Sequence, residues 1–167
     1  QPLMRNGNDR YIGQAIPMKG IDLLLKAAVS VPREIDFELK IYANLDKEPA
    51  YASELHALAD GDARIRFCGT FPNGDMGRIL SSIDMLVVPS IWYDFPLVIP
   101  SAFATRTPVI ATDLPGMNEM VEDGTSGFLF HRGDWKQLAG LIERVASNPE
   151  TARAMSSTLP TVKSDRQ

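Results

Sequence analysis

Cysteine and histidine are scarce in this 167-residue chain, which has one cysteine and two histidines. The single thiol, Cys68, excludes an internal disulfide and a metal site built from several cysteines. The histidines, His56 and His131, do not have metal-ligand spacing. No apolar run approaches the roughly 20 residues that cross a bilayer. We therefore expect a cytoplasmic protein with no transmembrane segment and no metal site.

An excess of positive charge and the common phosphate-binding motifs are also missing. Lys and Arg number 17 and Asp and Glu number 21, which gives a net charge of -4. This balance provides no general positive field for nucleic acid, so we expect no nucleic-acid partner. The chain contains neither the G-x-G-x-x-G of dinucleotide-binding domains nor the G-x-x-x-x-G-K-[ST] of P-loops. We therefore expect no bound cofactor.

What the chain does contain is a regular alternation of short apolar runs with amphipathic stretches. Strands are predicted at residues 10–15, 36–43, 64–69, 84–90, 108–113 and 126–130. Helices are predicted at residues 19–31, 50–60, 74–83, 134–147 and 148–157. This order predicts an α/β domain with a Rossmann-like parallel sheet of about six strands and helices on both faces. We expect the domain to span residues 10–157, between a polar lead-in at 1–9 and a polar tail at 158–167.

Two of the predicted strands indicate where a ligand would bind. The apolar runs at residues 84–90 and 108–113 are continuous rather than alternating, which is typical of strands buried on both faces. A helix-length connection joins them, so we expect them to lie parallel with a right-handed crossover. Parallel sheets bind ligands beyond the carboxyl ends of their strands, so the loops that follow the strands are the places to look for a site.

Six segments in a fixed order make the chain similar to a known family. They are YIGQAIPMKGIDLLLKA, LKIYA, IRFCGTF, ILSSIDMLVVPSIW, FPLVIPSAFATRTPVIATDLPGMNEMVEDGTSGFLF and GDWKQLAGLIERV. From about Arg10 to Ser156 they resemble the C-terminal, donor-binding domain of GT-B-fold glycosyltransferases of family 4, also called group 1. The resemblance implies a hexosyltransferase of polysaccharide biosynthesis. Its donor would be a nucleotide-diphospho-sugar, used as substrate for retaining transfer.

The resemblance also implies a partner and a location. GT-B enzymes have a second, N-terminal domain that contacts the acceptor, so we expect that domain to be missing from this chain or supplied in trans. The expected location stays the cytoplasm, with the inner face of the membrane as an alternative. Asp60-Gly61-Asp62 spells the D-x-D that holds a metal in some sugar transferases. Between a predicted helix and a predicted strand, however, it is better interpreted as a turn with glycine at the helix end.

The first family signature concerns the diphosphate of the donor. In family members the first strand ends in Gly-Arg and a Lys-Gly pair follows, and the Arg and Lys neutralise the diphosphate. Here Gly13, Lys19 and Gly20 match, but Gln14 takes the place of the Arg. A cation at the diphosphate acts where negative charge develops as the sugar bond breaks. Gln14 donates a hydrogen bond but lacks the bidentate cationic fork, so Lys19 is the expected remaining cation.

The second family signature is a pair of glutamates, of which the later holds the ribose hydroxyls and the earlier faces the donor sugar. The alignment places these positions at Tyr93 and Ser101, so both carboxylates are missing. A one-residue shift in the loop would bring Asp94 to the first position, and the alternative is a capping or solvated Asp. Trp92 and Phe95, beside the site, either stack on a base or sugar or fill the core.

The helix after the first of these positions completes the predicted donor site. In family members its N-terminal N–H groups meet the diphosphate. Pro96 suits the first helical position, and Leu97 and Val98 follow it as further donor-binding candidates. Pro100 would cost about 3 kcal/mol in a helix interior. We therefore expect the helix either to bend there or to begin near Pro100.

These departures from the family pattern leave three functions open. The first is a glycosyltransferase donor domain with a degenerate site, which we expect to be inactive as an isolated chain. The second is a non-catalytic interaction module derived from that family. The third is half of a GT-B sugar-nucleotide epimerase. No residue is assigned a catalytic role from the sequence.

Overall fold

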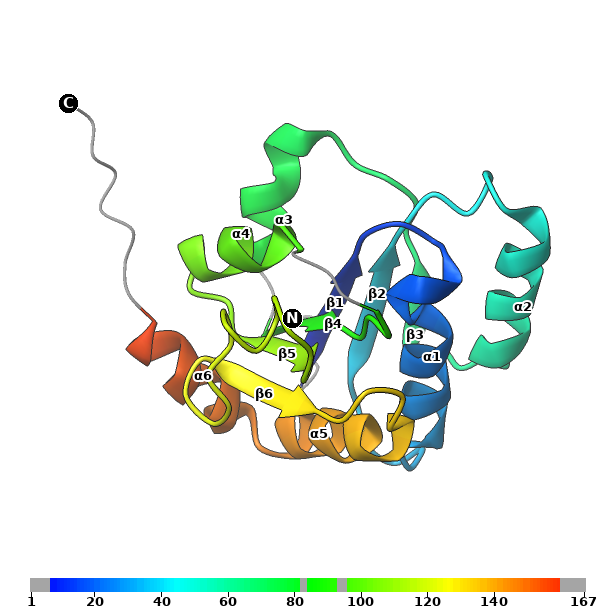
Figure 1. Ribbon diagram of the computed structural model, residues 1–167. Coiled ribbons are helices and arrows are strands. Elements are labelled where there is room, and N and C mark those ends of the chain that lie inside the picture. Colours follow the sequence, from blue (N-terminus) through cyan, green and yellow to red (C-terminus); the bar gives the residue numbers. More distant parts are fainter. Residues whose placement is uncertain (1–6, 82–83, 93–95, 160–167) are drawn as a thin grey trace, which may run out of the picture.

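A six-stranded parallel sheet forms the centre of the molecule in the computed structural model, which describes residues 7–81, 84–92 and 96–159. The strands are β1 (Asn8–Ile12), β2 (Glu38–Tyr42), β3 (Ile65–Phe67), β4 (Met85–Val88), β5 (Val109–Thr112) and β6 (Gly127–Phe130). Their order in the sheet is β3-β2-β1-β4-β5-β6, and neighbouring strands pair in parallel (Figure 1). The predicted sheet is therefore confirmed.

Helices cover both faces of this sheet, as predicted (Figure 1). On one face α1 (Ile21–Ser30) packs between α2 (Pro49–Ala59) and α5 (Trp135–Ser147). On the other face α3 (Met76–Ser81) packs against α4 (Val98–Ala104). The last helix, α6 (Pro149–Thr158), follows α5 and packs on it. None of the helices in the described ranges combines the length and the apolar composition that a bilayer crossing requires.

The β4 strand explains why its sequence is apolar without alternation. All four of its residues are buried. Met85 and Val87 belong to the core under α1, α2 and α5, whereas Leu86 and Val88 belong to the core under α3 and α4. A strand buried on both faces has no solvent-facing positions to mark its period. β4 also pairs in parallel with β5, with α4 in the connection between them, as the sequence predicts.

A buried arginine holds the end of α1 at the amino edge of the sheet. The Arg64 guanidinium donates to the main-chain carbonyls of Ala28, Val31, Pro32 and Ile35 at 2.8–3.3 Å. It also forms a 2.8 Å ion pair with Asp62. Satisfying the free carbonyls of a helix end in this way replaces the usual glycine cap.

The D-x-D motif therefore has a structural role. Asp60 is the left-handed C-cap of α2, and Gly61 continues the turn with φ 64°. Asp62 is buried and bonded to Arg64. The interpretation of this motif as a turn is confirmed, but the residue that caps the helix is Asp60 and not the expected glycine.

The domain extends beyond both expected boundaries. β1 begins at Asn8, inside the expected lead-in at 1–9, and the Asn8 main-chain N–H donates to the Asp84 carboxylate at 3.0 Å. At the other end α6 includes Thr158 and Leu159 is buried, inside the expected tail at 158–167. Polar residues at the end of a strand or helix can belong to it through hydrogen bonds, which the polarity of the local sequence does not predict. The remaining tail residues, 160–167, and residues 1–6 of the lead-in lie outside the described part.

Asp9 is a buried carboxyl group inside the sheet. It is 1% exposed and lies in register between Leu39 of β2 and Met85 of β4. Neither carboxyl oxygen has a hydrogen-bond partner within the described part of the chain. Burial, reinforced by the charge of Asp84, raises the pKa of the Asp9 carboxyl to about 8, against the lowering effect of Arg10. Asp9 is therefore protonated in the folded protein below that pH.

Asp9 should make the domain less stable as the pH rises. In the unfolded chain Asp9 loses its proton near pH 4, whereas the folded protein keeps it up to about pH 8. Its contribution to stability is complete below pH 4 and is lost between pH 4 and 8. The slope reaches about 1.4 kcal/mol per pH unit. Asp9→Asn removes this slope, which urea denaturation at pH 5, 6, 7 and 8 measures.

The control is Asp36→Asn, at an exposed position before β2, which should keep the slope of the parent. Identical pH dependence of the free energy of unfolding in the parent and Asp9→Asn would contradict the assignment of a buried, protonated Asp9.

Candidate donor-binding site

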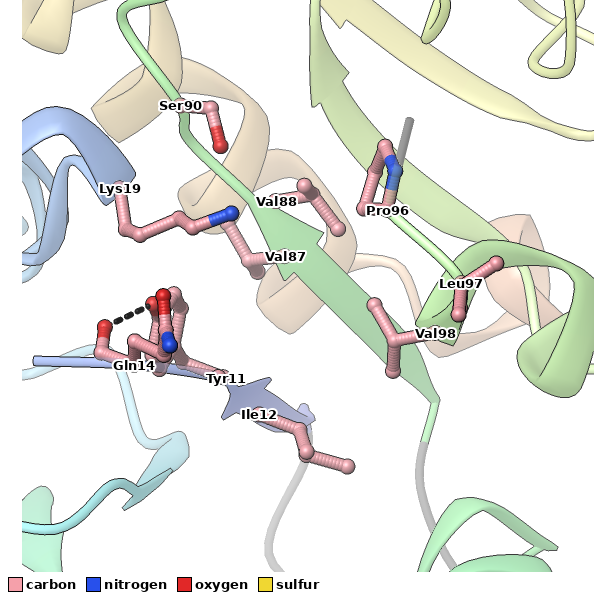
Figure 2. A pocket seen from close by; sticks show the side chains of 11 residues that line it. Tyr11, Ile12, Gln14, Lys19, Val87, Val88, Ser90, Pro96, Leu97 and Val98 are labelled. Atoms are coloured by element: carbon pink, nitrogen blue, oxygen red, sulfur yellow. Dashed lines mark hydrogen bonds between the residues drawn. The ribbon is translucent and has the colours of Figure 1, made fainter. Parts of the chain in front are cut away.

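A pocket lies at the carboxyl ends of the two central strands, β1 and β4 (Figure 2). Its volume is about 260 Å³. The chain leaves β1 toward β2 and β3 on one side and returns as β4 on the other, so the strand order reverses here. This is the topological switch point at which doubly wound sheets bind ligands. The lining residues are Tyr11, Ile12, Gly13, Gln14, Lys19, Val87, Val88, Ser90, Pro96, Leu97 and Val98.

Most of the predicted donor-binding residues meet in this pocket. The structure brings together the predicted residues Gly13, Gln14, Lys19, Pro96, Leu97 and Val98. Ser101 is not among the lining residues, because it lies one turn into α4, where its hydroxyl donates to the Leu97 carbonyl at 3.3 Å. The predicted residues Tyr93, Asp94 and Phe95 lie outside the described residues.

Sequence reasoning missed the pocket residues that belong to the strands. Tyr11 and Ile12 end β1, and Val87 and Val88 end β4. Their apolar character marks them as core, and only their place directly before a strand's exit loop could have signalled a second role. Ser90 also lines the pocket, two residues beyond β4, whereas the sequence placed it at the end of the predicted strand 84–90 and gave it no role in the site.

The turn that carries Lys19 is fixed against the loop after β4. A 3-10 turn, η1 (Pro17–Lys19), ends at Gly20, which has φ 77° and also precedes α1. A Cβ atom at Gly20 would overlap the carbonyl oxygen of Pro89. The Ile91 main-chain N–H donates to the Met18 carbonyl at 3.0 Å. Two backbones therefore meet directly, and glycine is required for both the approach and the dihedral angle.

The loop after β1 is held by a hydroxyl group. The Tyr11 hydroxyl donates to the main-chain carbonyl of Gln14 at 2.7 Å (Figure 2). Gly13 lies between them, and a Cβ atom there would be 2.8 Å from that hydroxyl. Figure 2 shows the Lys19 side chain extending toward the carboxyl end of β4, across the pocket from Pro96 and Leu97.

The pocket suits an anion that is attached to a less polar group. Among the lining residues that the structure describes, Lys19 carries the only charge. Gln14 adds a neutral amide, and Tyr11 and Ser90 add hydroxyl groups. The β4 and α4 sides are apolar, through residues such as Val88 and Leu97. A cation beside neutral and apolar groups suits the binding of a phosphate group.

The α4 helix corrects one expectation and decides between two others. It begins at Val98 with Leu97 as N-cap, so Pro96 precedes the helix instead of opening it. Pro100 lies in the first turn, where N–H groups have no acceptor within the helix, so the expected penalty does not arise. The sequence left two alternatives, a helix that bends at Pro100 and a helix that begins near it, and the structure shows the second.

The start of this helix offers fewer free N–H groups to a bound anion than the family resemblance implies. The Ile99 N–H already donates to the Pro96 carbonyl at 3.1 Å, and the two prolines have no N–H to give. The expected diphosphate contact from this helix end is therefore weaker than in the family pattern.

A second cavity lies further along the same edge of the sheet. It has a volume of about 450 Å³ and follows the ends of β2 and β3. Ala43, Asn44 and Asp46 line it from the loop after β2. The rings of His56 and Phe67 also line it, and their centroids are 4.4 Å apart. Together the two cavities extend across the carboxyl ends of β3, β2, β1 and β4.

A doubly wound parallel sheet with its pocket at the switch point defines a nucleotide-binding class of α/β domain. The family model described as "Glycosyl transferases group 1" matches residues 10–159. The chain therefore belongs to the group 1 glycosyltransferases.

The curated relatives that the chain matches have the names of sugar transferases. The chain is 26% identical over 146 residues to an alpha-D-kanosaminyltransferase of Streptomyces kanamyceticus, covering 87% of this chain and 38% of that protein. It is 31% identical over 148 residues to a D-inositol 3-phosphate glycosyltransferase of Mycobacterium sp. (strain KMS), covering 86% and 33%. The chain thus spans well under half the length of these relatives.

Solved structures show the same fold. HepE of Anabaena, solved in complex with UDP and glucose, has a TM-score of 0.82 at 24% identity, with 95% of this chain and 43% of that chain covered. Sucrose-phosphate synthase of Thermosynechococcus elongatus has a TM-score of 0.79 at 27% identity, covering 92% and 39%. The C-terminal domain of a group 1 glycosyl transferase (LpcC) of Francisella tularensis has a TM-score of 0.79 at 20% identity, covering 91% and 81%.

The tight contact at Gly20 should make it more sensitive to substitution than other glycines with positive φ. Gly61 is the matched control, since its φ of 64° is similar and nothing lies within 4 Å of an added Cβ atom. Both Gly20→Ala and Gly61→Ala should lose about 1–2 kcal/mol from the left-handed conformation. Gly20→Ala should lose a further 1–3 kcal/mol from overlap with Pro89. Equal losses in urea denaturation would show that the backbone contact is not tight in solution.

Proposed function

We propose that this chain binds a nucleotide-diphospho-sugar as the donor-binding part of a retaining glycosyltransferase. The observation that carries the proposal is the placement of the Lys19 side chain in the pocket at the carboxyl ends of β1 and β4. The turn beneath it is anchored to the β4 exit loop, so its charge is positioned before a ligand arrives. A preorganised charge stabilises a developing anion without reorganisation.

In this proposal Lys19 neutralises the diphosphate leaving group. Breaking the bond between the sugar and the distal phosphate leaves an additional negative charge on the nucleotide diphosphate. Gln14, which also lines the pocket, adds a neutral hydrogen bond. Charge neutralisation is assigned to Lys19 and not to a metal ion, and the proposal needs no bound cofactor.

The nucleoside end of the donor would extend along the sheet edge toward the second cavity. That cavity follows β2 and β3, next to the diphosphate pocket in strand order. The ring pair of His56 and Phe67 and the polar side chains of Asn44 and Asp46 suit a flat base with polar edges. Support for a nucleotide comes from family membership and from the fold shared with HepE, which was solved with UDP.

The site is proposed to be a weakened version of the family site. A second cation is replaced by Gln14, and the Ser101 hydroxyl is engaged by the Leu97 carbonyl instead of facing a ribose. The matched relatives contain a further length of chain, and transfer is proposed to need an acceptor-binding domain of that kind. The isolated chain is therefore expected to bind donor weakly and to transfer no sugar.

Removing the Lys19 charge should weaken binding of nucleotide diphosphates. A charge-assisted contact contributes about 1.5–3 kcal/mol, so Lys19→Met should raise the Kd for UDP or GDP by about 10- to 100-fold. Calorimetric titration in low salt measures this effect. Lys26→Met, at an exposed position of α1, is the matched control and should leave the Kd unchanged.

Two results would contradict the proposal. Equal affinity of Lys19→Met and the parent would remove Lys19 from the diphosphate site. Absence of binding of UDP, GDP and their sugar derivatives by the parent would replace the donor-binding function with that of an interaction module.

Restoring the missing cation should strengthen binding. Gln14 lines the pocket, so Gln14→Arg places a guanidinium beside the diphosphate and should lower the Kd for UDP or GDP about tenfold in low salt. The gain should fade at high salt, as screening reduces the charge interaction. Ser101→Glu should give no gain, because Ser101 lies outside the pocket lining. A tighter Ser101→Glu variant, or no effect of Gln14→Arg at any salt, would show a different placement of the ligand.

A further inference from the structure

The three large apolar side chains that the described residues expose all belong to segments that contribute to one pocket. They are Met18, 45% exposed, Trp92, 56% exposed, and Leu97, 81% exposed. Met18 directly precedes Lys19, Leu97 lines the pocket, and Trp92 follows the lining residue Ser90 by two positions. Exposed apolar side chains scattered singly need no explanation, whereas several in the segments that form a single pocket indicate a binding surface.

The exposure of Trp92 excludes the interpretation that it fills the core. Its neighbour Ile91 is bonded through its N–H to the Met18 carbonyl at 3.0 Å. Pro89, two residues before Ile91 in the sequence, contacts Gly20. The backbone before Trp92 is therefore held against the turn that carries Lys19, so the exposed indole starts from a fixed point near the pocket. An indole kept out of the core forgoes the stabilisation of burial, which calls for another role.

The size of the pocket indicates that a ligand extends out of it. About 260 Å³ is less than the roughly 300–1,000 Å³ that encloses a drug-sized ligand. A nucleotide-diphospho-sugar whose diphosphate contacts Lys19 must therefore extend out of the pocket. If its nucleoside follows the sheet edge toward β2 and β3, its sugar lies on the side of the β4 exit loop, where Trp92 is found.

The indole matches one face of a sugar ring. A pyranose carries its hydroxyl groups mainly around the edge and presents C–H groups on its faces. A flat, rigid aromatic side chain covers such a face over a large area. This recognition needs no carboxylate, in a site where the resemblance predicts that both glutamates of the family pattern are missing.

We propose that Trp92 is the platform on which the sugar ring of the donor stacks while Lys19 holds the diphosphate. The inference rests on the proposed donor-binding function. It deepens that function by assigning sugar recognition to a residue outside the family's charged signature. Trp92 then contributes to the affinity for the nucleotide-sugar but not to the affinity for the nucleotide alone.

Calorimetric titration of the full chain with UDP, UDP-glucose, GDP and GDP-mannose tests this assignment. Trp92→Ala should weaken binding of the bound nucleotide-sugar about threefold to tenfold and leave the Kd of the matching nucleotide within twofold. Trp92→Phe, which keeps a flat ring, should retain most of the affinity. Thermal unfolding of both variants checks that the fold is intact.

Fluorescence gives an independent readout, since the chain has two tryptophans. In a Trp135→Phe background the emission reports on Trp92. The nucleotide-sugar should protect this emission from iodide quenching, and the nucleotide alone should not. Trp135 is a suitable position to replace, because it lies at the start of α5 and outside the pocket lining.

Each other outcome overturns a defined part of the inference. If Trp92→Ala loses equal affinity for the nucleotide and for the nucleotide-sugar, Trp92 lies against the nucleotide. Unchanged affinity for a nucleotide-sugar that the parent binds would remove Trp92 from the site and leave the proposed function standing. If the parent binds none of the four compounds, the proposed function fails and the Trp92 assignment fails with it.

Discussion

The direct contact between Gly20 and the carbonyl of Pro89 is the constraint from which the site follows. It brings the turn before α1 against the loop after β4, two segments that are distant in the sequence. No side chain fits between them, so the distance and the direction of Lys19 are set by backbone atoms. The pocket therefore forms between two neighbouring central strands whose exit loops are joined, and its charge is held in place by the scaffold.

The opposite end of α1 is held just as firmly, by different chemistry. Arg64 donates to four carbonyls there while it pairs with the buried Asp62. A buried guanidinium is tolerated because its donors are satisfied and its charge is paired. α1 thus connects a clamp at the amino edge of the sheet to the glycine contact at the carboxyl edge. The helix that follows Lys19 is fixed at both ends, which suits a site that positions its ligand through few contacts.

The site balances one cation against several neutral and apolar groups. Lys19 is the proposed contact for a diphosphate, Gln14 and two hydroxyl groups add uncharged polar groups, and the start of α4 has few free N–H groups among the described residues. In such a site, apolar contact area is expected to supply part of the binding affinity that charged groups would otherwise supply. In the proposed arrangement the exposed Trp92 supplies that area near the charge. Family membership and this arrangement are compatible, because a fold fixes where a ligand lies and leaves the contacting side chains free to vary.

The sequence by itself determined the sheet, the covering of both its faces and the family, because the continuous apolar runs of β4 and β5 and the motif order have few other solutions. It also predicted which loops carry Gly13, Gln14 and Lys19, since parallel strands end at one edge. It did not determine the start of α4, the exclusion of Ser101 from the pocket, the burial of Asp9 or the exposure of Trp92. Those properties depend on which surfaces meet in space, and local patterns record only what a residue prefers. Gly20 shows the difference: the sequence places it near the start of a predicted helix, and only the tertiary structure reveals the Pro89 carbonyl that requires it to be glycine.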